Sequence, residues 1–147
     1  MELSFIFQPY YYDLYKDQID SAENIGKELN EYLSGKSYVT DLKLDRIVLI
    51  FINTQGMKCR VRPYYMGTSN HKDPIEFNVM TLFYEIPMPE KEFVQVSDED
   101  RPTYIAKALL DVLETRKAPV KIREQFDRER FIADVKDFFV NVKGCKL

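Results

Sequence analysis

The stretch "RIVLIFINTQGMKCRVRPYYM", from Arg46 to Met66, places two different strand patterns next to each other. Residues 47–52 are apolar without a break and rich in β-branched side chains, which predicts a strand covered on both faces. The tetrapeptide "NTQG" at 53–56 is typical of a turn. From residue 57 to 65, basic and apolar residues alternate, as expected for a half-buried strand. The stretch therefore predicts a β-hairpin.

The segments on either side add one strand and one helix before the hairpin, and one strand and two helices after it. Alternation over 3–7 predicts a first strand, and apolar residues at helical spacing over 14–33 predict a helix that Gly35 ends. A further strand is expected over 75–86, followed by "SDEDRP", which is typical of a helix start. Asp127 is a candidate cap for the last helix.

The order of elements is β-α-β-β-β-α-α. Consecutive strands that are joined by short turns favour an antiparallel sheet of about four strands with the helices packed on one face. We therefore predict an α+β fold, and the length of 147 residues predicts one domain over 1–147.

Composition narrows the class of protein. Hydrophobic residues make up 45% and charged residues 31% of the chain, and the net charge is −3. No run of 18 apolar residues predicts a membrane span, and "MELSFIFQPYYYD" lacks the basic start and cleavage site of a signal peptide. A cytoplasmic protein without membrane contact is expected, with Cys59 and Cys145 as free thiols.

The residues offer no set typical of catalysis. His71 is the single histidine and belongs to a polar loop, while Cys59 falls on the apolar face of its predicted strand. One histidine and two distant cysteines do not form a typical zinc site, and no glycine-rich phosphate loop is present. We therefore expect no enzyme, no cofactor and no metal.

The strand at 58–65 suggests one kind of binding surface. Arg60, Arg62 and Tyr64 share one face of it, a combination that can contact phosphate and stack on a base. A sequence pI of about 5.3 counts against nucleic acid, and the next strand does not extend the basic stripe. A nucleic-acid-associated module remains the alternative to a protein-binding one, and nucleic acid is the less favoured partner.

The segment "PYYYDLYKDQID", residues 9–20, suggests a protein-binding surface instead. Tyrosine supplies contact area at low entropic cost, and the acids between the tyrosines complement a basic partner. The alternative is that two of the tyrosines pack under the helix while the acids favour its N-terminus. The first predicted contact region consists of Tyr10, Tyr11, Tyr12, Asp13 and Asp17. The second consists of Asp98, Glu99 and Asp100, which the start of a helix also explains.

Four segments together resemble the small acidic immunity proteins of bacterial polymorphic-toxin systems. They are "RIVLIFINTQGMKCRVRPYYM", "IEFNVMTLFYEI", "SDEDRPTYIAKALLDVLE" and "FDRERFIADVKDFF", and the resemblance covers roughly residues 40–140. It implies a cytoplasmic binder that neutralises a cognate toxin domain, by covering the active site of the toxin or an exosite nearby. Such families share no catalytic motif, so no residue role is carried over. If the toxin is a basic nuclease, acidic side chains would imitate the phosphates that its active site expects.

Overall fold

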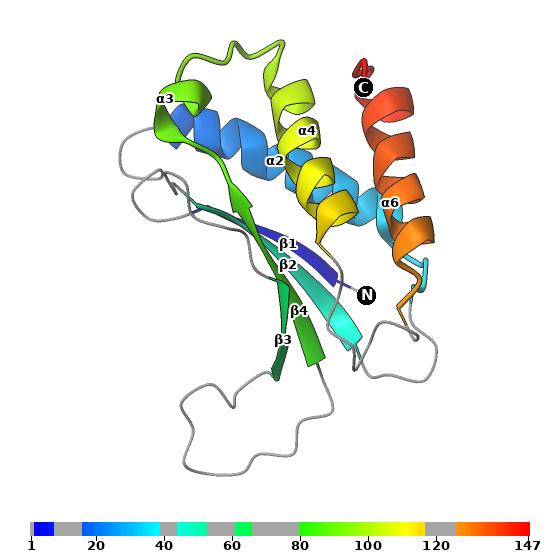
Figure 1. Ribbon diagram of the computed structural model, residues 1–147. Coiled ribbons are helices and arrows are strands. Elements are labelled where there is room, and N and C mark those ends of the chain that lie inside the picture. Colours follow the sequence, from blue (N-terminus) through cyan, green and yellow to red (C-terminus); the bar gives the residue numbers. More distant parts are fainter. Residues whose placement is uncertain (1, 8–15, 39–43, 53–60, 66–79, 117–125) are drawn as a thin grey trace, which may run out of the picture.

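The computed structural model describes residues 2–7, 16–38, 44–52, 61–65, 80–116 and 126–147 (Figure 1). The strands are β1 (Glu2–Phe7), β2 (Leu44–Ile52), β3 (Val61–Tyr65) and β4 (Met80–Pro87). The helices are α2 (Lys16–Leu33), α3 (Glu90–Phe93), α4 (Arg101–Thr115) and α6 (Arg128–Asp137), and a π-helical turn, η1 (Phe138–Val142), continues α6.

The strands form one sheet in the order β1-β2-β4-β3. β1 and β4 both pair with β2 in parallel, and β3 pairs with β4 antiparallel at one edge. Three of the four strands therefore run in the same direction. The unit β1-α2-β2 is a parallel crossover in which the helix carries the chain back to the start of the next strand.

The predicted antiparallel sheet is therefore wrong, and so is the predicted hairpin between the second and third strands. β4 lies between β2 and β3, so these two strands do not pair. The all-apolar run of β2 is typical of a central parallel strand with neighbours on both sides, because such strands are covered on both faces. The predicted turn at 53–56 and the beginning of the strand predicted over 57–65 lie outside the described residues, as do positions 75–79 of the strand predicted over 75–86.

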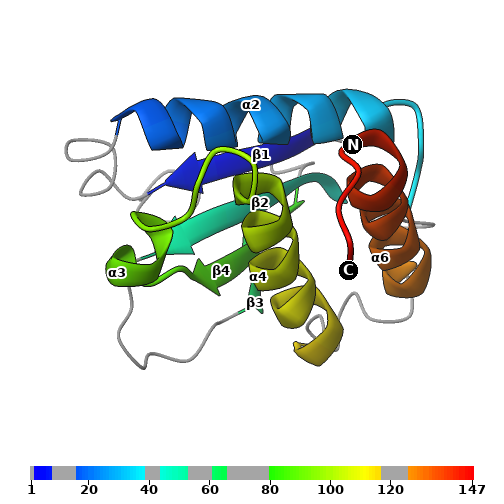
Figure 2. The same cartoon turned by 90° about the horizontal axis from the view of Figure 1, so that it is seen from above.

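The core lies between the sheet and the helices. Leu3, Ile47 and Leu82 stand at matching register positions across three parallel strands, and all three side chains are buried. Rows of this kind fill one face of the sheet, and the figures show α2, α4 and α6 gathered over that side (Figures 1 and 2). On β1, by contrast, Ile6 has 42% of its surface exposed.

Helix α2 lies unusually close to β1. A Cβ atom at Gly26 would stand 2.6 Å from Cγ of Phe5, well inside van der Waals contact. Glycine is therefore required here by the close approach of the helix to the strand, although glycine weakens a helix interior. The backbone N–H of Leu3 also donates to Oδ1 of Asn30 on α2 at 2.8 Å, which joins the same two elements.

The two C-terminal helices begin near the predicted positions. The side chain of Asp127 accepts a hydrogen bond from the N–H of Arg130, so the predicted cap of α6 is confirmed. Asp100 occupies the N-cap position of α4 without a capping side-chain hydrogen bond, and Pro102 stands in the first turn, where it is tolerated. Among the helices that the structure describes, none has the length and apolar character that crossing a membrane requires.

Candidate functional site

One end of the molecule carries a group of exposed acids. Asp98, Glu99 and Asp100 form the loop before α4, and Asp17 lies in the first turn of α2. Both views place α3 and the beginning of α2 at the same end of the molecule (Figures 1 and 2). The fold thus brings Asp17 of the first predicted contact region to the end that holds the second.

Arg101 attaches the acidic loop to α2. Its guanidinium is buried, with 3% of the residue exposed, and Nη1 donates to Asp98 Oδ1 at 2.5 Å and to Ser21 Oγ at 3.3 Å. Nη2 donates to the carbonyl oxygen of Val96 at 3.2 Å. Because Ser21 lies one turn beyond Asp17 on α2, the arginine holds the loop beside the acidic start of that helix.

The loop acids remain available to a partner to different degrees. Asp98 pairs with Arg101, yet 93% of its side chain is exposed. Ser97 Oγ donates to Asp100 Oδ2 at 3.1 Å and accepts from the N–H of Asp100 at 3.3 Å. The positive end of the α4 dipole favours these carboxylates, in line with the alternative that they mark the start of a helix. These acids therefore combine a favourable position at the start of α4 with charge at the surface.

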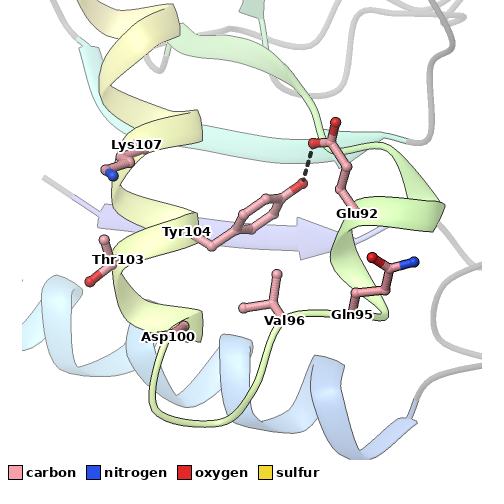
Figure 3. Close-up of a pocket in the computed structure, with 7 residues that line it drawn as sticks. All are labelled: Glu92, Gln95, Val96, Asp100, Thr103, Tyr104 and Lys107. Carbon is pink, nitrogen blue, oxygen red and sulfur yellow. Dashed lines mark hydrogen bonds between the residues drawn. The ribbon is translucent and has the colours of Figure 1, made fainter.

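A recess of about 560 Å³ opens next to this loop, between α3 and α4 (Figure 3). Its wall is made of Glu92, Gln95, Val96, Asp100, Thr103, Tyr104 and Lys107. The ring of Tyr104 points from α4 toward α3, and its hydroxyl donates to Glu92 Oε2 at 3.3 Å (Figure 3). Burial, and then the charge and hydrogen bond of Glu92, raise the pKa of Tyr104 to about 12. The hydroxyl therefore keeps its proton at neutral pH and acts as a donor.

The sequence pattern did not predict the recess. Its α3 side is the short helix Glu90–Phe93, whose Phe93 N–H donates to the carbonyl of Pro89 at 2.9 Å. A proline followed by acids is a signal for a helix N-terminus and would have indicated it.

The other predicted residues are less informative. Tyr10, Tyr11, Tyr12 and Asp13 lie outside the described residues, and so does Arg60. Arg62 and Tyr64 belong to β3 at the edge of the sheet, where they pair in register with Phe83 and Thr81 of β4. The placement of their side chains lies outside what the structure describes.

The chemistry of the described surface agrees with a binding role. Within the described ranges, no three or more histidine, cysteine or carboxylate side chains gather closely enough to hold a metal ion. The groups at the acidic end are exposed carboxylates, the half-buried Tyr104 and the exposed Lys107, and charges of this kind can pair with a partner of opposite sign.

Comparison with known proteins identifies the family. The family model described as immunity protein 44, Imm44, matches residues 1–141. Neither the curated proteins nor the solved structures gave a significant match. The resemblance to polymorphic-toxin immunity proteins is thereby confirmed, and with it the expectation of a non-enzymatic protein that has a cognate toxin as its partner. The chain belongs to the Imm44 family of immunity proteins.

Proposed function

We propose that this protein neutralises its cognate toxin by binding it directly, and that the acidic end formed by Asp17, Asp98, Glu99 and Asp100 is the contact surface. The family match, over residues 1–141, is the observation that carries the proposal, because an immunity protein acts on a toxin. A bound inhibitor without catalytic groups must act by covering or distorting a surface of its target.

The charge distribution supports this choice of surface. Residues 90–100, which form α3 and the acidic loop, carry five acidic side chains and one basic side chain, a net charge of −4. The buried Arg101 binds Asp98 of this loop and Ser21 of α2, which places the loop near Asp17. A concentration of one sign of charge at one end steers a partner of opposite sign and fixes its orientation.

The same charges suggest the kind of toxin. A nuclease domain has a basic active site that binds phosphate, and carboxylates held on a rigid helix start would occupy such a site as an anion does. A basic nuclease is therefore the toxin that we infer. Tyr10, Tyr11, Tyr12 and Asp13 precede α2 directly in the chain, and we include them in the proposed contact region.

Charge reversal tests the surface. The double variant Asp17→Lys, Glu99→Lys should lower the association rate with the cognate toxin domain by about tenfold or more at low salt. Its association rate should also depend less on salt. The control is Glu31→Lys with Ser34→Lys, which changes the net charge by +3, against +4 in the test variant, at the other end of α2 and should associate at nearly the wild-type rate. Equal rates for all three proteins would exclude the acidic end.

A further inference from the structure

We propose that the recess between α3 and α4 receives one lysine or arginine side chain of the toxin, with Glu92 pairing its charge, Tyr104 covering its stem and Asp100 adding negative charge at the rim. This rests on the proposed function, since it names the group of the partner that the acidic end recognises. The recess differs from the acidic loop because an aromatic ring lines it together with the carboxylates.

The carboxylate of Glu92 is held in place from within the recess. The Tyr104 hydroxyl donates to Oε2 at 3.3 Å, which leaves Oε1 as an acceptor for an incoming donor. Asp100 lines the recess at the start of α4, and its carboxylate is also exposed. An ammonium or guanidinium placed here would gain charge-assisted hydrogen bonds, which are about twice as strong as neutral ones.

The ring and the apolar wall suit the rest of such a side chain. Tyr104 is half-buried and packs against the core, so its ring is a fixed surface. Val96 lies beside it in the recess (Figure 3). The methylene stem of lysine or arginine packs on apolar surface while the charged head stays at a polar rim, and a cation beside a tyrosine ring is further attracted by the ring.

Lys107, the basic residue of the recess, does not occupy the position beside Glu92 that we propose for the toxin's cation. Lys107 lies across the view from Glu92, with its amino group turned away from the carboxylate (Figure 3). The recess, with a volume of about 560 Å³, is open to solvent on one side, so a side chain of a partner can enter it from the surface. The recess therefore presents carboxylate and aromatic groups to a partner and leaves space for a long side chain.

The recess is tested by measuring the affinity of variants for the cognate toxin domain by titration calorimetry. Glu92→Gln should weaken binding about tenfold and Tyr104→Ala about thirtyfold, as expected for residues at an interface hot spot. Lys107→Gln should bind as tightly as the wild type or more tightly, because it removes a positive charge near the proposed position of the toxin's lysine or arginine. Glu31→Gln removes the same charge as Glu92→Gln far from the recess and should change the affinity less than twofold.

The outcomes separate the two proposals. Failure of the wild-type protein to bind the toxin would overturn the proposed function itself. Wild-type binding with unchanged affinity in both Glu92→Gln and Tyr104→Ala would overturn the recess alone. Tighter binding by Glu92→Gln together with weaker binding by Lys107→Gln would also overturn it, because the occupant would then be acidic. Glu92 is exposed, so Glu92→Gln should stay folded and keeps the test decisive even if Tyr104→Ala does not fold.

Discussion

The guanidinium of Arg101 lies 2.5 Å from the carboxylate of Asp98, and the two side chains differ almost completely in exposure. Arg101 is 3% exposed and Asp98 is 93% exposed. The arginine is a buried cation whose carboxylate partner stands in solvent, and its guanidinium also contacts Ser21 of α2. One pair therefore fixes the position of the acidic loop and leaves an acid available at the surface.

The pair between Asp98 and the buried Arg101 predicts that Asp98 contributes more to stability than its neighbour Glu99. Asp98→Asn removes the charge that pairs with a buried guanidinium, so the free energy of unfolding should fall by about 1–3 kcal/mol. Glu99→Gln is the control, because Glu99 is an exposed neighbour in the same loop, and its effect should stay within about 0.5 kcal/mol. Urea denaturation measures both. Equal stabilities would mean that the pair contributes little.

The contact between Gly26 and Phe5 predicts the effect of adding one methyl group. Gly26→Ala should lower the free energy of unfolding by about 1–3 kcal/mol, because the new Cβ would stand 2.6 Å from the ring of Phe5. This loss exceeds the gain of about 1 kcal/mol that alanine brings to a helix interior. In a Phe5→Ala background the loss should largely disappear. A stabilised single variant would show that α2 can shift away from β1.

The buried hydroxyl of Tyr84 predicts a pH effect. It has no hydrogen-bond partner among the described residues, and burial raises the pKa of Tyr84 from 10.0 to about 12. Because the folded pKa is the higher one, the folded state keeps its proton where the unfolded chain loses it. The contribution of Tyr84 to stability is therefore complete below pH 10 and is lost as the pH rises toward 12.

Tyr84→Phe should remove this alkaline loss. At pH 7 its free energy of unfolding should equal that of the wild type or exceed it by about 1 kcal/mol, because an unpaired buried hydroxyl is removed. Between pH 10 and 11 the variant should lose less stability than the wild type. Thermal unfolding across this range measures the difference. A variant that is clearly less stable at pH 7 would indicate that the hydroxyl has a partner.

The parts of the fold that depend on local signals could be predicted from the sequence. The last helix and its cap at Asp127 depend on a few consecutive residues, and both were predicted. The order of the strands was not, because pairing joins residues far apart in the chain. The unbroken apolar run of β2 indicated two covered faces, but the expected short turn after it led to the wrong neighbour.

In the candidate site, too, local features could be predicted and long-range contacts could not. The acids at 98–100 stand out in the sequence, and so does Asp17. Their presence at one end depends on the contact between Arg101 and Ser21, 80 residues apart, which no local pattern indicates. The recess depends on the contact between Tyr104 and Glu92, which lie 12 residues apart on two different helices. Sequence therefore indicated candidate acids but not the hollow beside them.

The most direct test of the central claim is a titration of the cognate toxin domain with the purified protein, following binding and toxin activity in the same samples. Direct neutralisation predicts a stoichiometric complex with nanomolar affinity at physiological salt, and loss of toxin activity in proportion to the complex formed. A toxin that stays fully active in the complex, or one that forms no complex at all, would contradict it.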